Sequence, residues 1–458
     1  MKLSVFILAL ALIMGIGAPV LGQHEDGSSE FKMALTGDSI ITRKLSVYKE
    51  PEFLEMIDII RDADVAFTNL EMLFHDYEPY PMAESGGTWM RAAPSLADDL
   101  VWAGFDMVAR ANNHTGDYGV LGMNLTTKYV AESGMIQAGV GNSLAEAREA
   151  KFLETSKARV SLISLSSSFA RHMSAGKSRD NHPARPGLNP LRYSTTYVLP
   201  QEQFTSLVDT ARKLGELNGQ DGESRGYNAE EPNKLTAFGK NFTVGDNLEV
   251  LNKANDQDLN EITAVINNAS RVSDYTIVTM HAHEGEKRSE PAPFLHDVAR
   301  AMIDAGADTF VGHGPHALRG IEIYKGKPIF YSLGDFMFQN ETLDRLPSDS
   351  YEAFGLGENA HLADWNDERY AKDTRSFPTV PDVWEAVIAE PKFKDGKLIS
   401  LKLYPIELGF GKARQVRGRP ILAKGELAKK IISDMIERSA PYGTKIRYEN
   451  GIGIVDLD

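Results

Sequence analysis

Short apolar runs alternate along the chain with segments whose apolar side chains recur at the spacing of a helix. Residues 31–40 (FKMALTGDSI) and 64–74 (DVAFTNLEMLF) are typical of buried strands, whereas residues 50–63 (EPEFLEMIDIIRDA) carry their apolar side chains at helical spacing. This order of strand, polar loop and helix continues as far as residues 328–336 (PIFYSLGDF). The alternation predicts an α/β fold with layered sheets and one core over residues 31–340.

Two polar segments interrupt this alternation. Residues 213–257 are rich in Gly, Asn and charged side chains, and residues 341–376 are also polar; we predict an insertion at the first and a lid over a ligand crevice at the second. From residue 383 onward the pattern predicts a hairpin around a Lys-Asp-Gly-Lys turn, followed by a helix over residues 425–440. Residues 341–458 are therefore expected to complete the same domain as the core.

The N-terminal segment, residues 1–22, is typical of a secretory signal peptide. Lys2 precedes an apolar run, and Val20 and Gly22 predict cleavage before Gln23. The run is short for a membrane-spanning helix, and an uncleaved anchor formed by residues 3–22 is the alternative. A polar linker, residues 23–30, leads to the core, so we expect an exported protein.

The composition limits the metal ligands and the binding partners that the protein can have. The chain of 458 residues contains no cysteine, which excludes disulfides, a lipidated cysteine and thiolate metal ligands. The formal net charge of −15 argues against a nucleic-acid-binding protein, which would present a basic face. The negative net charge is compatible with an anionic substrate, because a local basic patch or a metal ion can hold one.

Polar side chains with lone pairs follow almost every predicted strand. They are Asp38, Asn69 and Glu71, Asn113 and His114, His281 and His283, His313 and His316, and Asp335. Ligands of open α/β sheets bind at the carboxyl ends of the strands, so we expect one shared site. Without thiolates, such a set suits Mn, Zn, Fe, Mg or Ca. The alternatives are solvent-facing loop histidines and a turn-capping role for Asp38.

Two histidine pairs carry most of this metal-site hypothesis. His313 and His316 lie among glycines in VGHGPHALRG, and glycines let the backbone approach a ligand. His281 and His283 share one face of a strand end, where we expect one to bind and the other to support it. Asn113 offers a neutral oxygen to a metal, and the adjacent His114 is free to act as a general acid.

Residues 168–193 form a second candidate feature, because basic side chains concentrate in this irregular loop. They include Arg171, Lys177, Arg179, Arg185 and Arg192, with Asp180 as the opposing charge. A guanidinium matches a carboxylate or a phosphate, so the loop is a candidate clamp for an anionic substrate. The alternative is a solvated loop whose arginines pair with acidic neighbours.

The ordered motifs resemble those of a known family. GDS, NLE, ANNHTGDYG, HAHEGE and the long segment GADTFVGHGPHALRGIEIYKGKPIFYSLGDFMF are similar to the motif series of the CapA, or poly-γ-glutamate capsule synthesis, family. That family is related to the calcineurin-like metallophosphoesterases. The resemblance therefore implies a layered α-β-β-α sandwich of metallophosphoesterase type, with a site for one or two divalent ions (Mn, Zn, Fe or Mg). It also implies contact with cell-envelope capsule machinery.

The resemblance extends to individual positions. The implied metal ligands are Asp38, Glu71, Asn113, His281, His313 and His316, with Glu71 in the bridging position. His114 is the implied acid and Asp117 continues its motif, while Asp335 replaces the family's usual Asn and adds negative charge or acts as a base. Ile40 replaces a histidine ligand of the phosphoesterases, and Glu71 replaces Asp. These departures weaken the case for phosphatase activity more than the case for metal binding.

Together these features predict an exported metal-dependent hydrolase. A metal-activated water would attack a phosphoester, or a γ-glutamyl or peptide amide, of an anionic small molecule or polymer. The principal alternative is a non-catalytic accessory protein that binds polyglutamate or another surface polymer during capsule assembly or export. A structural surface protein without a site is the third hypothesis.

Overall fold

A computed structural model describes residues 30–217 and 231–457 of the chain. The expected signal peptide and nearly all of the polar linker after it lie outside these ranges. Within them, no helix combines the length and the apolar character needed to cross a membrane.

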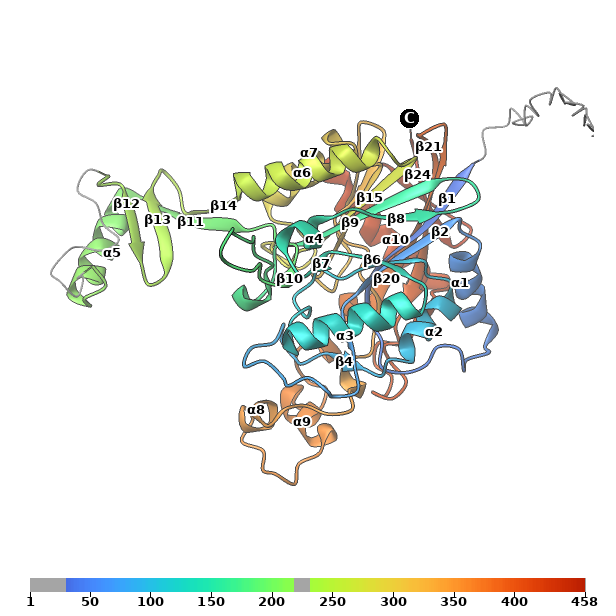
Figure 1. The fold of residues 1–458 in the computed structure, drawn as a ribbon, viewed down its shortest axis with the longest axis horizontal. Helices are drawn as coiled ribbons and strands as arrows, with labels where there is room; N and C mark the ends of the chain where they lie inside the picture. The colour runs from blue at the N-terminus through green and yellow to red at the C-terminus, as the bar shows by residue number, and fades with distance from the viewer. Residues whose placement is uncertain (1–29, 218–230, 458) are drawn as a thin grey trace, which may run out of the picture.

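The larger sheet is built around strand β1, which begins the described chain (Figure 1). Its strands lie in the order β23 (Ile446–Glu449), β24 (Ile452–Val455), β21 (Lys397–Glu407), β20 (Glu385–Lys394), β1 (Phe31–Ile40), β2 (Val65–Leu70), β5 (Met107–Ala109) and β6 (Ile136–Ala138), with β19 (Asp335–Phe338) beside β1 and β22 (Ile421–Leu422) beside β21. Strands β1, β2, β5, β6 and β19 run parallel, whereas β20 is antiparallel to β1. The carboxyl ends of five strands thus point the same way.

The second sheet has four parallel strands with an antiparallel strand at each edge. The order is β17 (Ile321–Tyr324), β18 (Lys327–Phe330), β16 (Thr309–His313), β15 (Tyr275–His281), β9 (Arg159–Ser166) and β8 (Lys151–Glu154). Strands β15 and β9 are buried along nearly their whole length, as expected for a sheet covered on both faces.

The two sheets share one hydrophobic core. Phe31 and Phe67 of the larger sheet pack in the same cluster as Leu162, Ile277 and Val311 of the second sheet. Helix α10 (Gly425–Ser439) contacts β17 of one sheet and β21 and β24 of the other, and its apolar face joins this cluster. The C-terminal helix therefore belongs to the central core.

Helices cover the outer faces of both sheets. Helices α1 (Pro51–Arg61) and α2 (Leu96–Ala103) pack in a cluster with the outer face of the larger sheet, and α6 (Asp256–Ser270) and α7 (Pro293–Asp304) do so on the second sheet. The apolar positions of residues 50–63 that predicted a helix, including Phe53 and Met56, are buried there. A layered mixed α/β architecture is thus confirmed.

Shorter elements complete the core and its loops. They are α3 (Gly119–Glu132), α4 (Leu144–Arg148), β3 (Leu73–Phe74), β4 (Arg91–Ala92), β7 (Val140–Gly141), β10 (Gly187–Leu188) and the 3-10 helices at Arg171–Met173, Asn340–Thr342, Phe377–Thr379, Pro381–Trp384 and Ala440–Tyr442.

A small unit projects from one side of the molecule (Figure 1). It consists of β11 (Tyr193–Leu199), α5 (Gln201–Lys213), β12 (Lys234–Ala237), β13 (Lys240–Val244) and β14 (Glu249–Ala254), and it has its own small hydrophobic cluster. The polar segment 213–257 makes up most of this unit, but the unit already starts at β11, which pairs with β13 and β14.

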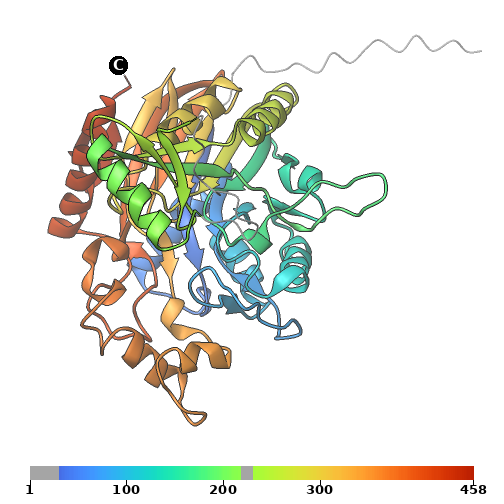
Figure 2. The ribbon, with the colours of Figure 1, turned by 90° about the vertical axis from the view of Figure 1, so that its left-hand side faces the viewer.

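The segment 341–376 carries two short helices, α8 (Ser348–Glu352) and α9 (Leu362–Arg369), at the end of the molecule away from the C-terminus (Figure 1, Figure 2). A buried ion pair between Glu341 and Arg417 connects it to the chain after the hairpin β20–β21. The hairpin itself turns at Asp395 and Gly396, as its sequence predicts.

Candidate metal centre

Seven side chains that can bind metal converge where the two sheets meet. Three groups each have their potential ligand atoms within 4.8 Å of one another: Asp38, His281 and His313; Glu71, His283 and His316; and Asp38, Glu71, His316 and Asp335. The groups share Asp38, Glu71 and His316, so they form one continuous centre. The strand ends thus converge on one site, as the sequence pattern predicts.

Strand pairing explains why these residues meet. Asp38 lies opposite Asn69 and Asp335 in the parallel pairs of β1 with β2 and β19, and His281 lies opposite His313 in β15 and β16. Gly37 permits the close approach of β1 to the turn before β19, because a Cβ there would stand 1.8 Å from the carbonyl oxygen of Gly334.

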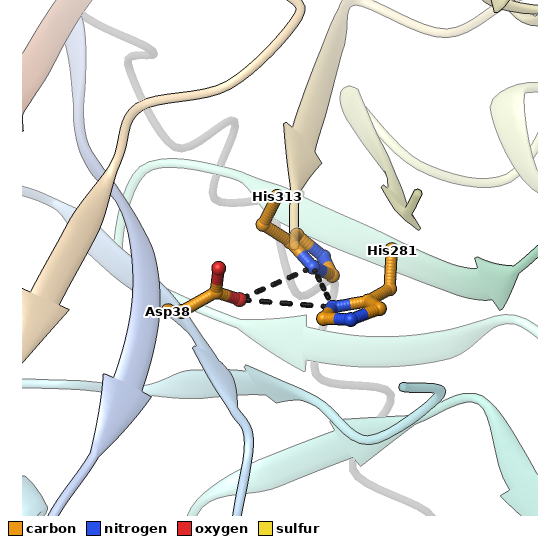
Figure 3. Close-up of side chains that lie close together, drawn as sticks. All are labelled: Asp38, His281 and His313. Atoms are coloured by element: carbon orange, nitrogen blue, oxygen red, sulfur yellow. Dashed lines mark hydrogen bonds and ion pairs between the residues drawn. The ribbon is translucent and has the colours of Figure 1, made fainter. Parts of the chain in front are cut away.

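The first group is rigidly held. Asp38 Oδ1 lies 3.7 Å from His281 Nδ1 and 3.5 Å from His313 Nδ1, and the two imidazoles face each other with 3.0 Å between these nitrogens (Figure 3). The Asn69 side chain donates to Asp38 Oδ1 at 2.7 Å, and the Gly314 N–H donates to Oδ2 at 2.8 Å. Both carboxylate oxygens are therefore fixed before any ligand arrives.

The second group is centred on Glu71, which follows β2. Its carboxylate is fully buried, and neither oxygen has a hydrogen-bond partner among the described residues. Its Oε1 lies 3.7 Å from His281 Nε2 and 3.8 Å from His114 Nε2. Asp335 Oδ2 and Asn113 Oδ1 are likewise buried without a partner there. Because an uncompensated buried carboxylate is costly, this donor set fits a cation.

Burial and charge shift the titration of the centre. Burial, and then the neighbouring Asp335, raise the pKa of Asp38 to about 7. Burial and Asp38 together raise the pKa of Glu71 well above its usual value. Burial lowers the pKa of His313 to about 3 and that of His281 well below its usual value. His281 and His313 are therefore neutral, as metal ligands must be, and they do not compensate the charge of the carboxylates.

His316 takes an unusual backbone conformation to reach the centre. Its φ of 52° is in the left-handed region, and its Nδ1 lies 2.8 Å from Asp335 Oδ1. Burial alone would lower its pKa, but Asp335 outweighs burial and raises the pKa of His316. A strained backbone at a convergence of polar groups is typical of a functional site.

The polar residues between Asn112 and Asp117 make different contacts. Asn112 donates to the Leu70 carbonyl at 2.8 Å and so fixes the end of β2. Asp117 Oδ2 lies 2.7 Å from His114 Nδ1, which leaves Nε2 directed towards Glu71. Asn113 donates to the Gly86 carbonyl at 2.8 Å, so its buried oxygen is free for another ligand.

A cavity of about 420 Å³ opens from this centre to solvent. Its lining includes Asn113, His114, His283 and His316 from the centre, and Ile40 at the position of the missing histidine. The loops at Gly86–Thr88 and Gly285–Arg288, together with Arg369 and Phe377, also line the cavity. Arg369 of the segment 341–376 thus contributes directly to the cavity wall, and a lid function of this segment stays a prediction.

The basic loop lies elsewhere. Arg192 pairs with Asp258 at 2.7 Å and Lys177 with Glu261 at 2.5 Å, and Arg185 donates to the Ser174 carbonyl at 2.8 Å. Arg171 and Arg179 are exposed, and none of the five basic residues lines the cavity. Their role in anion binding stays a prediction.

Two residues of the site were not singled out from the sequence, and a third was given a smaller role. His283 was expected only to support His281, yet its Nε2 lies 3.0 Å from His281 Nε2 and belongs to the Glu71 group. Its position two residues after His281 was the signal for it. Arg288 and Arg369 line the cavity without any local pattern that predicts this.

Comparison with known proteins identifies the family. Residues 32–340 match the family described as bacterial capsule synthesis protein PGA_cap. The chain belongs to this family.

Individual relatives agree with this assignment. The chain is 37% identical over 440 residues to the uncharacterized proteins y4sH and y4uA of Sinorhizobium fredii, and the match covers 93% of each chain. It is also 22% identical over 344 residues to the capsule biosynthesis protein CapA of Bacillus anthracis, over 73% of this chain and 66% of the relative. A further relative is the probable polyglutamine synthesis accessory protein of Mycobacterium tuberculosis, with 30% identity over 148 residues, 32% of this chain and 31% of the relative. The resemblance seen in the motifs is thus confirmed.

Proposed function

We propose that this protein is an exported metal-dependent hydrolase that acts on an anionic substrate in capsule metabolism. Its two packed sheets with outer helices support an α-β-β-α sandwich of metallophosphoesterase type. The apolar N-terminal segment followed by Gln23 supports export.

The observation that carries this proposal is the state of Glu71. Both of its oxygens are buried without a partner in the described chain, between two groups of ligand-capable side chains. A binding crevice for a polymer would gain nothing from an unpaired buried carboxylate, whereas a bridging metal ligand requires one.

The donor set assigns roles to the chain's own residues. Asp38, His281 and His313 would hold one ion, and Glu71, His283 and His316 a second, with Asn113 Oδ1 as a further neutral donor. A bound divalent ion lowers the pKa of water and polarises an ester or amide. The carboxylate of Asp117 orients His114, so that Nε2 would donate a proton to the leaving group.

The names of the relatives indicate the substrate class. They concern capsule biosynthesis and polyglutamine synthesis, so a γ-glutamyl amide stands beside a phosphoester as the bond that is cleaved. Both reactions develop charge on an oxygen, which the same centre stabilises.

A non-catalytic accessory protein is the second candidate. It is favoured by Ile40, an apolar side chain that lines the cavity where the phosphoesterases carry a ligand, and by the word accessory in the name of the mycobacterial relatives. On this hypothesis the cavity binds an anionic polymer, and chelation leaves the affinity for that polymer unchanged.

The decisive experiment measures metal content and hydrolysis in the same preparations. Mature protein purified without chelator would be analysed by elemental mass spectrometry, and then assayed with bis-p-nitrophenyl phosphate and γ-glutamyl p-nitroanilide. We expect one or two ions per chain, lost in Asp38→Asn and His313→Ala. The matched control is Asp382→Asn, in the acidic group of Asp382, Glu385 and Asp434 that Lys430 already neutralises. Metal without turnover of either substrate would favour the accessory protein, and no metal uptake would overturn both the site and the hydrolase.

A further inference from the structure

Two guanidinium groups line the cavity without a carboxylate partner in the part of the chain that the structure describes. Arg288 belongs to the loop after β15, and Arg369 is the last residue of α9. Among the described residues neither forms an ion pair, although the protein carries a net charge of −15. An uncompensated positive charge in such a chain needs a physical explanation.

Neutral groups hold Arg288 in place. Its guanidinium donates to the Pro315 carbonyl at 2.8 Å and lies 5.5 Å from the ring centre of Phe377. Phe377 in turn packs edge-on against His316 of the metal centre, 5.7 Å away. Arg288 therefore lies beside the segment that carries His316, and its charge remains available to a ligand.

Uncharged groups also hold Arg369, which belongs to the segment 341–376. It donates to the Thr88 hydroxyl, and its guanidinium lies 4.8 Å from the ring of Trp365 and 5.4 Å from that of Tyr370. Asn340 donates to the Tyr370 hydroxyl at 3.0 Å and ties this end of α9 to the core. Hydrogen bonding and ring contacts order the side chain without neutralising it.

Two neighbouring arginines outside the cavity wall differ from this pair. Arg414 pairs with Asp367 and Asp373, and Arg417 pairs with Glu341, so carboxylates neutralise both. In the cavity wall Lys287 pairs with Glu290 at 2.9 Å, and Glu286 pairs with neither arginine in the described chain.

We propose that Arg288 and Arg369 form a second anion-binding subsite, which takes an oxyanion of the substrate while the reacting group lies at the metal centre. This inference rests on the proposed function of the same cavity. The substrate then carries at least two anionic groups on one molecule, either carboxylates or phosphates, because a planar guanidinium matches both. Preordered side chains lose little entropy on binding, which makes such a subsite effective.

The test measures binding rather than turnover. Mature protein loaded with Mn²⁺ would be titrated calorimetrically with hexaglutamate and with inorganic triphosphate, at low and at moderate ionic strength. The variants are Arg288→Gln and Arg369→Gln, with Arg369→Lys as the conservative change. The matched control is Arg271→Gln, which removes one exposed charge at the C-terminal end of α6, outside the cavity.

We expect each glutamine variant to weaken binding of at least one probe by about tenfold and to reduce its salt dependence, while metal content and melting temperature stay at the wild-type values. Arg369→Lys should retain most of the affinity. The probe that is weakened identifies the anion as a carboxylate or a phosphate. The subsite is overturned if wild-type protein binds neither probe, if both glutamine variants bind within about twofold of wild type, or if Arg271→Gln loses as much affinity. A protein that binds the probes through these arginines but holds no metal would contradict the proposed hydrolase and leave the subsite intact.

Discussion

The imidazole of His114 is held by the carboxylate of Asp117, with 2.7 Å between Nδ1 and Oδ2. The same carboxylate accepts from the backbone N–H groups of Gly86 and Met90, each at 2.8 Å. Asp117 therefore fixes both the proposed acid and the loop that forms one wall of the cavity. Its position three residues after His114 allows both functions from a single turn.

His114→Gln should abolish most turnover without loss of metal. Since the imidazole is the proposed proton donor, we expect kcat to fall by about a hundredfold or more, with KM little changed. Asp117→Asn keeps one acceptor oxygen for the loop and should have the smaller effect, together with a changed pH profile. Steady-state kinetics and metal analysis check both variants. Full activity in His114→Gln would exclude it as the acid.

The strand ends of the centre were predictable because local pattern and topology agree. Asp38, His281 and His313 each end, or nearly end, an apolar run, and the carboxyl ends of parallel strands necessarily meet at one edge of a sheet. No knowledge of the loops is needed for that inference.

Other parts of the site depend on contacts that local pattern does not encode. Arg369 reaches Thr88 across 281 positions of the chain, from a polar helix without a clear apolar face. The projecting unit starts at β11 because this strand pairs with β14, whose first residue lies fifty positions after the end of β11. Basic side chains in residues 168–193 suggested an anion clamp by composition, whereas pairing with Asp258 and Glu261 depends on helix α6, far along the chain.

Metal affinity should rise with pH between 6 and 8. The pKa of Asp38 is raised to about 7, so at pH 6 a cation must displace a proton from this ligand, and at pH 8 it need not. His313, with its pKa lowered to about 3, is neutral throughout this range and does not contribute. Below the pKa we expect about a tenfold loss of Mn²⁺ affinity per pH unit for each proton released.

Calorimetry in two buffers of different ionisation enthalpy measures both the affinity and the proton release. Asp335 is one of the groups that raise the pKa of Asp38, so Asp335→Asn should move the midpoint of the rise to lower pH. Equal affinity at pH 6 and pH 8, or binding without release of protons, would contradict this assignment.

Arg319 should organise the loop that carries His283 and Arg288. Its guanidinium is only 1% exposed and donates to the carbonyls of Glu284 and Arg288, each at 3.0 Å. Gly285 permits this packing, since a Cβ there would lie 2.9 Å from Arg319 Nη2. We expect Arg319→Met to lower the free energy of unfolding by about 2–4 kcal/mol, because several buried carbonyls lose a charged donor.

Urea unfolding checks this value, and amide exchange should show faster opening of residues 282–290. The control is Arg159→Met, which removes an exposed pair with Glu154 and should cost less than about 1 kcal/mol. Equal stability of the two variants would mean that Arg319 does not organise the loop.

The ion pair of Arg417 with Glu341 should fix the segment 341–376 to the core. Both side chains are almost fully buried, and Arg417 Nε donates to Glu341 Oε2 at 2.5 Å. Arg417→Met leaves Glu341, within the described chain, with Arg414 as its one remaining ion-pair partner, at 3.4 Å, so we expect a loss of about 3 kcal/mol in the free energy of unfolding and faster proteolysis of this segment. The double variant Arg417→Met with Glu341→Gln removes both charges and should recover part of the loss.

A thermodynamic cycle over the two single variants and the double variant measures the coupling, which should exceed about 1 kcal/mol. Additive single effects would show that the two residues act independently, and α9, with Arg369 at its end, would then owe its position to other contacts.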